Sequence, residues 1–222
     1  MCGGEWEGER APPTPFSLFF PPQKSAYNSI PSKPARLTWA DFIQVAGAAA
    51  VVATGGPSIP VALGRPDARR ADPGGALPPP SLDAAGLRSL FAANGYTVRD
   101  IVAISGSHTI GVSRVNDPKG GREGRGRARG GARRADHAPD RLPTPAHPHS
   151  PGKMTATPAT FDNSYYKLLL KGGGAFRSDR ALVEDPEMRA LVQTYARDQG
   201  AFFRDFADAY VKMGLKGLAV AA

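Results

Sequence analysis

Apolar residues recur every three or four positions in six stretches of the chain, which is the period of an amphipathic α-helix. The clearest is "SLDAAGLRSLFAANG", where Leu82, Leu87, Leu90 and Phe91 form one apolar stripe. No stretch alternates convincingly with the period of a β-strand. We therefore expect an all-α fold. The six expected helices lie within residues 37–56, 81–95, 96–111, 161–174, 185–200 and 201–214.

Capping residues predict where several of these helices begin and end. Thr38 followed by Asp41, and Thr97 followed by Asp100, have the spacing of a capping box, in which side chain and backbone bond reciprocally at a helix start. Further expected N-caps are Ser81 and Asp185, and glycines expected just beyond helix ends are Gly95 and Gly200.

Composition predicts the domain boundaries. Residues 1–36 are interrupted by prolines, as in "RAPPTP" and "FFPPQ", and predict an irregular extension. The domain then occupies residues 37–222, interrupted by a Gly/Arg/Pro-rich segment, residues 118–152, that we expect to be a disordered insert. A retained non-coding stretch in the gene would account for this segment, and a transcript lacking it would support that interpretation.

The net charge of +8 raises the question of a nucleic-acid partner. Residues 119–150 alone hold eight basic and three acidic residues, so the rest of the chain is only weakly basic. That segment has no aromatic side chain to stack on bases. We therefore expect no nucleic-acid partner.

The remaining composition limits the class of protein. A length of 222 residues with 41% hydrophobic content suits one domain with a real core. The single cysteine, Cys2, excludes an intramolecular disulfide and suits a reducing, intracellular compartment. The longest apolar stretch, residues 42–53, is too short to span a membrane. We expect no membrane span.

The candidate chemistry depends on one histidine. Of the four in the chain, His137, His147 and His149 lie in the biased segment, whereas His108 lies in the helix-like stretch "DIVAISGSHTIG". A lone histidine at a helix end is most often a capping or core residue. Its alternative role is that of a metal ligand.

Six strings in order resemble the haem peroxidases of the plant superfamily, most closely the intracellular ascorbate peroxidase class. They are "LTWADFIQVAG", "TGGPSIPVALGRPDA", "GYTVRDIVAISGSHTIG", "TATPATFDNSYYKLLL", "RSDRALVEDP" and "AFFRDFADAYVKMGLKG". The resemblance spans roughly residues 37–222 apart from the insert. The resemblance implies a haem-peroxidase fold with haem b as cofactor, here incomplete because the distal helices are expected to be missing.

The resemblance also implies roles for single residues. His108 matches the proximal ligand of the haem iron, and Asp179 matches the carboxylate that accepts a hydrogen bond from its other ring nitrogen. Ser105 and Arg114 match haem contacts, Arg114 to a propionate. From its position alone, Asp179 could equally be an N-cap of "RALVED".

A second set of residues matches a cation site of the ascorbate-type enzymes. Their hydroxyl, carbonyl and carboxylate oxygens suit K⁺ or Ca²⁺. The same residues could be ordinary turn and cap residues. The set comprises Thr109, Thr155, Thr157, Thr160 and Asp162.

The sequence departs from the family pattern at three points. Nothing in residues 1–36 resembles the distal arginine–histidine string, and no histidine precedes His108, so we expect no distal catalytic residue. Met154 stands where the family has a tryptophan. Asp117 stands where ascorbate users carry an arginine, which leaves the reductant open.

Two functions follow from the resemblance. The first is a haem peroxidase that reduces hydrogen peroxide with a small reductant, ascorbate or a phenol, in oxidative-stress defence in the chloroplast or cytoplasm. The alternative is a non-catalytic peroxidase-like protein with a structural or associating role in the plastid. Without distal helices, we expect Ile101 and Val102 to lack partners, each forfeiting roughly 1.5–3 kcal/mol.

Overall fold

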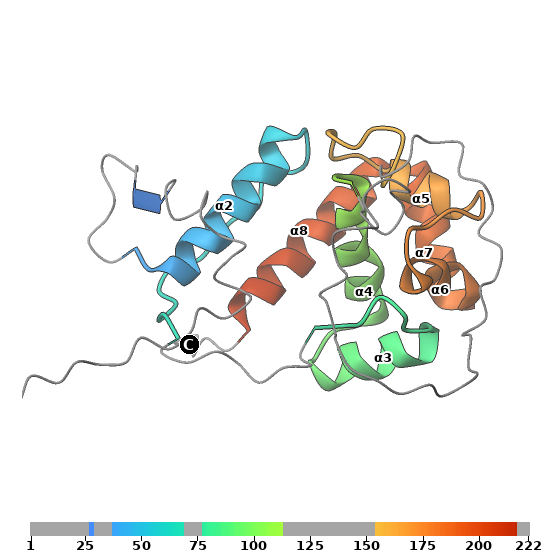
Figure 1. Ribbon diagram of the computed structural model, residues 1–222, viewed down its shortest axis with the longest axis horizontal. Helices are drawn as coiled ribbons and strands as arrows, with labels where there is room; N and C mark the ends of the chain where they lie inside the picture. The colour runs from blue at the N-terminus through green and yellow to red at the C-terminus, as the bar shows by residue number, and fades with distance from the viewer. Residues whose placement is uncertain (1–26, 29–36, 69–76, 113–153, 217–222) are drawn as a thin grey trace, which may run out of the picture.

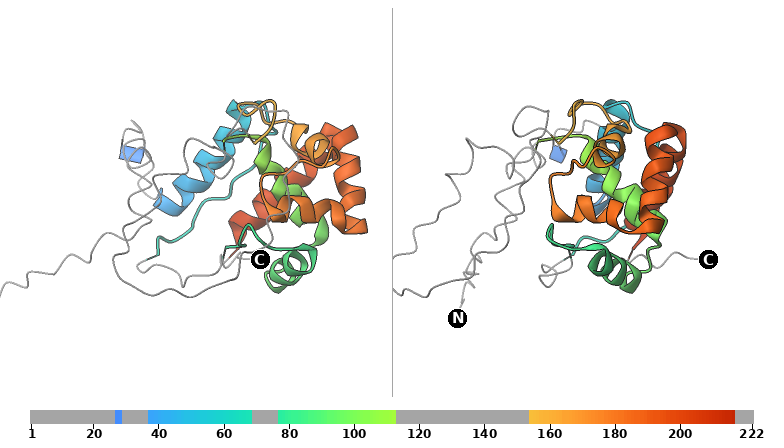
Figure 2. Two further views of the ribbon diagram at one scale, coloured as in Figure 1. Left: turned by 45° about the vertical axis from the view of Figure 1, so that its right-hand side comes forward. Right: turned by 90° about the vertical axis from the view of Figure 1, so that its right-hand side faces the viewer.

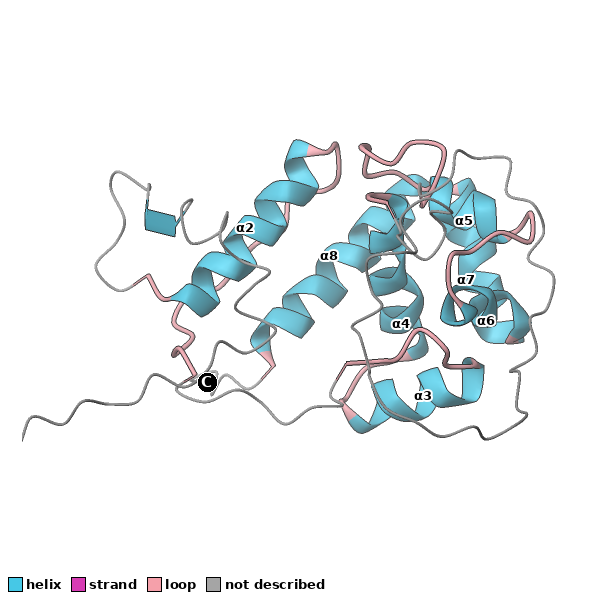
Figure 3. Ribbon diagram, in the orientation of Figure 1, coloured by secondary structure: helices cyan, strands magenta, loops and turns pink. Residues whose placement is uncertain are grey.

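The computed structural model describes residues 27–28, 37–68, 77–112 and 154–216. These residues contain helices and no β-strand, so the expectation of an all-α fold is confirmed (Figure 3). The expected extension and insert, together with Arg114, lie outside the described residues apart from residues 27–28. The α-helices are α2 (Trp39–Ala53), α3 (Ala84–Ala93), α4 (Val98–Ser105), α5 (Ser164–Leu169), α6 (Arg177–Glu184), α7 (Pro186–Arg197) and α8 (Gln199–Leu215).

Helix α4 runs through the middle of the helical assembly, in contact with α3, α7 and α8 (Figure 1). Helices α5, α6 and α7 pack against one another on one side of it, and α3 lies across one end in both views of Figure 2. Helix α2 stands at the other side, alongside α8, where the Tyr210 hydroxyl donates to the carbonyl of Gln44. Within the described ranges, no helix is long and apolar enough to cross a membrane.

The core lies between α4 and the three helices α5, α7 and α8. Ile101 and Val102 on α4 are 1% and 0% exposed. The expectation that these residues would lack partners is therefore wrong. Helix α4 packs against α7 and α8, which come from the C-terminal part of the sequence. The largest side chains buried around them are Phe161, Tyr165, Tyr166, Tyr195 and Phe202.

Apolar surface is left uncovered elsewhere, on α2. Val45 and Val52 are 40% and 50% exposed, and Leu63, in the loop that follows α2, is 58% exposed. With Ala49 and Ile59 these side chains line an apolar groove. This groove therefore exposes apolar surface on α2 and its loop, while Ile101 and Val102 on α4 are covered.

The helix ends follow the predicted capping in part. Thr97 and Asp100 form the expected reciprocal box, with each side chain bonded to the other residue's backbone N–H. Asp185 caps α7 as expected, and Gly95 lies just beyond α3 with a φ of 80°. Ser81 is not a cap: α3 is capped by Asp83 instead, whose carboxylate accepts from Gly86. Nor does Gly200 end a helix, because Asp198 caps α8 ahead of it.

Asp41 departs from its predicted capping role. Thr38 caps α2 by accepting from the Asp41 N–H, but the Asp41 carboxylate turns to the following loop instead of back to the Thr38 N–H. It accepts from the N–H groups of Gly64 and Arg65 at 2.9 and 3.1 Å, and from Arg65 Nη1 at 3.0 Å. Asp41 is 1% exposed, so the contact is a buried ion pair.

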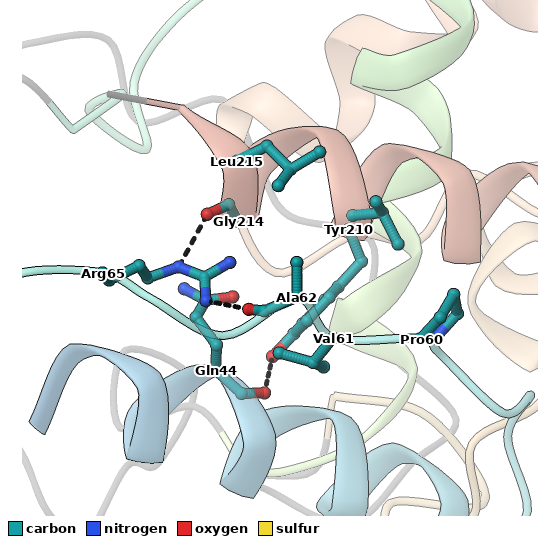
Figure 4. A pocket seen from close by; sticks show the side chains of 9 residues that line it. Gln44, Pro60, Val61, Ala62, Arg65, Tyr210, Gly214 and Leu215 are labelled. Carbon is teal, nitrogen blue, oxygen red and sulfur yellow. Dashed lines mark hydrogen bonds between the residues drawn. The ribbon is translucent and has the colours of Figure 1, made fainter. Parts of the chain in front are cut away.

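Arg65 joins this loop to the end of the chain. Its Nε donates to the carbonyl of Gly214 at 2.8 Å, across 149 positions of sequence. Figure 4 shows the guanidinium between α2 and α8, with the Tyr210 hydroxyl donating to the Gln44 carbonyl beside it. A Cβ on Gly214 would lie 2.9 Å from the Gln44 Oε1 atom, so glycine permits this close packing.

Candidate functional site

The candidate site begins where α4 ends. The α-helix stops at Ser105, and residues Gly106–Thr109 form a short 3₁₀-helix, η1. A Cβ on Gly106 would clash with the Tyr166 hydroxyl and with the ring of Phe202. Glycine therefore lets this turn pack directly on the aromatic core, which sets the position of His108 two residues later.

His108 and Asp179 meet across 71 positions of sequence. The His108 Nδ1 lies 2.8 Å from Asp179 Oδ1. Only 2% of the Asp179 side chain is exposed, against 36% of the His108 side chain. The pair therefore consists of a buried carboxylate and a partly exposed imidazole.

Two further donors hold the Asp179 carboxylate in place. Asp179 is the third residue of α6, and its Oδ2 accepts from the backbone N–H of Phe176 at 3.0 Å. Its Oδ1 accepts from the hydroxyl of Tyr165 at 2.8 Å. The expectation that Asp179 could be the N-cap of "RALVED" is wrong, because α6 begins two residues earlier and Phe176 is its N-cap. The Asp179 carboxylate instead bonds both the backbone at the helix start and the imidazole.

This arrangement determines what the imidazole can do chemically. A carboxylate only accepts hydrogen bonds, so His108 donates through Nδ1, and the neutral form of this tautomer has its lone pair on Nε2. The Nε2 atom makes no hydrogen bond with any described residue, and the rings of Phe176 and Tyr165 flank the imidazole at centroid distances of 5.4 and 5.8 Å. An imidazole oriented by a carboxylate, with its second nitrogen open, is the usual form of a metal-ligating histidine.

The two other residues predicted to contact haem are Ser105 and Arg114. Among the described residues, Ser105 makes no side-chain hydrogen bond to His108. The Ser105 hydroxyl donates to the Ile101 carbonyl of its own helix at 2.8 Å. Arg114 lies outside the described residues. Met154 is 9% exposed and its N–H donates to the Gly111 carbonyl at 3.2 Å, so it closes the turn behind His108.

Four of the five residues predicted for a cation site converge beside η1. The Thr109 hydroxyl donates to Asp162 Oδ1 at 2.9 Å, and the Thr157 hydroxyl donates to Asp162 Oδ2 at 2.8 Å. The Thr155 hydroxyl donates to the Thr109 carbonyl at 2.7 Å. Thr160 is exposed and joins only through its backbone, which donates to the Thr157 carbonyl.

Ser164 completes this oxygen cluster and is not in the predicted set. Its hydroxyl lies 3.2 Å from that of Thr109 and 3.0 Å from that of Thr157, and its N–H donates to Asp162 Oδ1. Its place two residues after Asp162 in "FDNSYY" was the available signal, because an aspartate commonly bonds the backbone two residues on.

The charge of the cluster resides on Asp162. Burial raises the pKa of this carboxyl, but hydrogen bonds from Ser164, Thr157 and Thr109 outweigh it and lower the pKa overall. The carboxylate is therefore ionised at neutral pH, among hydroxyl and carbonyl oxygens. Across the described part of the chain there is no group of three or more histidine, cysteine, aspartate or glutamate side chains that could hold a metal ion.

Comparison with known proteins bears on both clusters. The peroxidase family model matches residues 19–198. Over 188 residues the chain is 37% identical to the cytosolic L-ascorbate peroxidase 2 of Oryza sativa subsp. japonica. This alignment covers 82% of this chain and 63% of the relative. Over 192 residues it is 36% identical to the peroxisomal L-ascorbate peroxidase 5 of Arabidopsis thaliana. This second alignment covers 85% of this chain and 58% of the relative.

The chain spans between 45% and 63% of the length of curated relatives that it matches. The family match includes α2 to α7 and both clusters, and its helical architecture agrees with an all-α peroxidase fold. The chain therefore belongs to the peroxidase family and, within it, is ascorbate peroxidase-like.

Proposed function

We propose that His108 holds the iron of a haem b through Nε2. The observation that carries this proposal is the 2.8 Å contact between His108 Nδ1 and the buried Asp179. The donor set fits the group, because neutral imidazole is a common ligand of haem iron and one ring nitrogen remains open. The ring is partly exposed, and Phe176 flanks it at a centroid distance of 5.4 Å.

Asp179 has a defined role in this proposal. It holds the proton on Nδ1, so that Nε2 presents its lone pair, and the strong hydrogen bond increases the donor strength of the ring. Tyr165 and the Phe176 N–H keep the carboxylate in that position. Haem, when bound, supplies the redox chemistry that cleaves hydrogen peroxide.

We infer further that the whole protein is a peroxidase that reduces hydrogen peroxide with a small reductant, ascorbate or a phenol. The relatives' names support ascorbate, and they refer to cytosolic and peroxisomal enzymes. An oxidative-stress role in the cytoplasm or the chloroplast is part of the same proposal.

A second candidate is a non-catalytic, structural or associating role. It is favoured by the sequence ahead of His108, which contains no histidine to move a proton between the peroxide oxygens. The two candidates differ in one measurable respect. An active enzyme oxidises the reductant when peroxide is added to the haem-loaded protein, and a non-catalytic relative binds haem without turnover.

The first test is the absorption spectrum of the purified chain titrated with hemin. We expect a Soret band typical of histidine-ligated haem, and we expect His108→Ala to lose it. The matched control is His147→Ala, which removes a histidine from the biased segment and should leave the band unchanged. A band that persists in His108→Ala, or that is absent from the unaltered chain, would exclude the proposed ligand.

We also propose that Asp162 and its hydroxyl partners bind K⁺ or Ca²⁺. The support is a single ionised carboxylate among hard oxygen donors, Thr109, Thr157 and Ser164. A cation that binds only the folded state stabilises it by about 2.7 kcal/mol at a hundredfold excess over its Kd.

Thermal unfolding with and without added K⁺ or Ca²⁺ tests this cation site. We expect the cation to raise the Tm of the unaltered chain and not that of Asp162→Asn. Asp208→Asn, which removes an exposed carboxylate on α8, is the control and should respond like the unaltered chain. An equal rise in all three proteins would show a nonspecific salt effect.

A further inference from the structure

Three of the six tyrosines form an unbroken file of rings that leads away from His108. The His108 ring lies 5.8 Å from that of Tyr165, measured between centroids. Tyr165 is 5.2 Å from Tyr166, and Tyr166 is 5.1 Å from Tyr195. The three tyrosines are 1%, 0% and 0% exposed, so no solvent separates the rings.

The outer end of this tyrosine file lies beneath a charged surface. The Tyr195 hydroxyl donates to Asp205 Oδ2 at 2.5 Å, and the same oxygen pairs with Arg99 Nη1 at 2.7 Å. The Asp205 and Arg99 side chains are 20% and 63% exposed. The middle member differs, because the Tyr166 hydroxyl donates to the Val102 carbonyl. Tyr195 is thus the tyrosine at the end of the file away from His108, and its hydroxyl donates to a carboxylate.

The environment of Tyr195 couples its oxidation to proton loss. Burial, followed by the Asp205 carboxylate, raises the pKa of Tyr195 well above its ordinary value. The phenol is therefore protonated at neutral pH. A phenol that loses an electron becomes a strong acid, and Asp205 stands in hydrogen-bond contact to receive the proton.

We propose that Tyr195 gives one electron to an oxidising equivalent held at His108, through the rings of Tyr166 and Tyr165. The phenolic proton moves to Asp205 in the same event. Tyr195 becomes a neutral phenoxyl radical, Asp205 becomes a neutral acid, and the oxidant at His108 is reduced by one electron. The inference rests on the proposed function, in which a haem held by His108 would supply the oxidant.

The tyrosine file then carries oxidising equivalents from the interior to a point just below the Arg99–Asp205 pair. A reductant too large to reach His108 is oxidised there and restores Tyr195 by returning an electron, while Asp205 returns the proton. Packing alone does not account for this arrangement, because a phenylalanine would fill the Tyr195 position without needing a carboxylate partner.

A haem-free experiment tests this electron path directly. Cys2→Ser removes the native thiol, and Ser107→Cys places a thiol on the exposed residue next to His108. A ruthenium polypyridyl complex is attached to this thiol. A laser flash excites the complex, and a soluble electron acceptor then oxidises it. Transient absorption detects the phenoxyl radical that follows. We expect a long-lived radical in this protein and its loss in the version that also carries Tyr195→Phe.

Two further variants keep the outcome interpretable. Asp205→Asn retains all three rings but removes the proton acceptor, so it should also lose the long-lived radical, even if Tyr195→Phe folds poorly. Tyr210→Phe alters a tyrosine on α8 outside the file and should retain it. A long-lived radical that persists in both Tyr195→Phe and Asp205→Asn overturns the proposal. Because no haem is involved, failure here is distinct from failure of the hemin titration.

Discussion

Asp179→Ala is expected to destabilise the chain by about 3–5 kcal/mol and to abolish haem binding at His108, because it removes the shared acceptor of three donors. The Tyr165 hydroxyl is fully buried, and without Asp179 it has no acceptor among the described residues. The Phe176 N–H at the start of α6 loses its partner as well. His108 loses the contact that keeps its proton on Nδ1.

Asp179→Asn separates the two effects. An amide offers one acceptor atom, whereas the carboxylate receives donors on both oxygens. In either amide orientation an NH₂ group faces another donor. We expect a smaller loss of stability than in Asp179→Ala, but a marked loss of haem affinity. A neutral amide is a weaker acceptor for the Nδ1 proton than the carboxylate, and in one of its two orientations it turns an NH₂ group toward Nδ1.

Urea unfolding gives the stability of both Asp179 variants, and hemin titration gives their affinity. Asp208→Asn controls for the loss of one negative charge at an exposed position. If Asp179→Asn binds hemin as tightly as the unaltered chain, the carboxylate does not orient the imidazole for ligation. If Asp179→Ala unfolds at the same urea concentration as the unaltered chain, the buried contacts of Asp179 contribute little.

Asp41→Ala is the second substitution with a large expected effect, a loss of about 3–5 kcal/mol. It leaves the Arg65 guanidinium, 10% exposed, without its carboxylate. It also deprives the Gly64 and Arg65 N–H groups of their acceptor. Because Arg65 also holds the Gly214 carbonyl, the damage should extend to the contact between α2 and α8.

The effect of Asp41 depends on pH in a defined direction. Burial raises its pKa, but hydrogen bonds from Gly64 and Arg65 outweigh burial and lower the pKa overall. A carboxyl with a lowered folded-state pKa stabilises above the unfolded-state value, about 3.9, and loses that contribution as the pH falls through the folded-state value. The difference between the unaltered chain and Asp41→Ala should therefore be largest near neutrality and shrink in acid.

Urea unfolding at neutral pH and at acid pH measures this difference. Asp67→Ala is the matched control, because Asp67 lies in the same loop and is exposed, and its partners among the described residues are the N–H groups of Trp39 and Ala40. It should cost about 1 kcal/mol, the usual effect of losing a helix cap. An equal loss for both aspartates would show that burial of the Asp41–Arg65 pair has no special weight.

Helix type and several helix ends could be read from the sequence, because the signals lie within a few positions of one another. The Thr97–Asp100 box and the Asp185 cap join residues that are at most three positions apart. Ser81 failed as a cap because Asp83, two residues later, offers the α3 backbone a carboxylate in its place. The motif around His108 and the "RSD" string also indicated which residues to expect together.

The tertiary structure alone decided which buried polar groups are partners. Thr38 and Asp41 have the same spacing as Thr97 and Asp100, yet only the second pair closes its box, because Asp41 is buried against a loop 24 positions away. In the same way Tyr165 bonds Asp179, 14 positions away, which no local pattern indicated. A local pattern determines a helix because the hydrogen bonds of a helix join residues that are close in sequence. A buried carboxylate must instead bond the donors that are buried beside it, and long-range packing selects those donors.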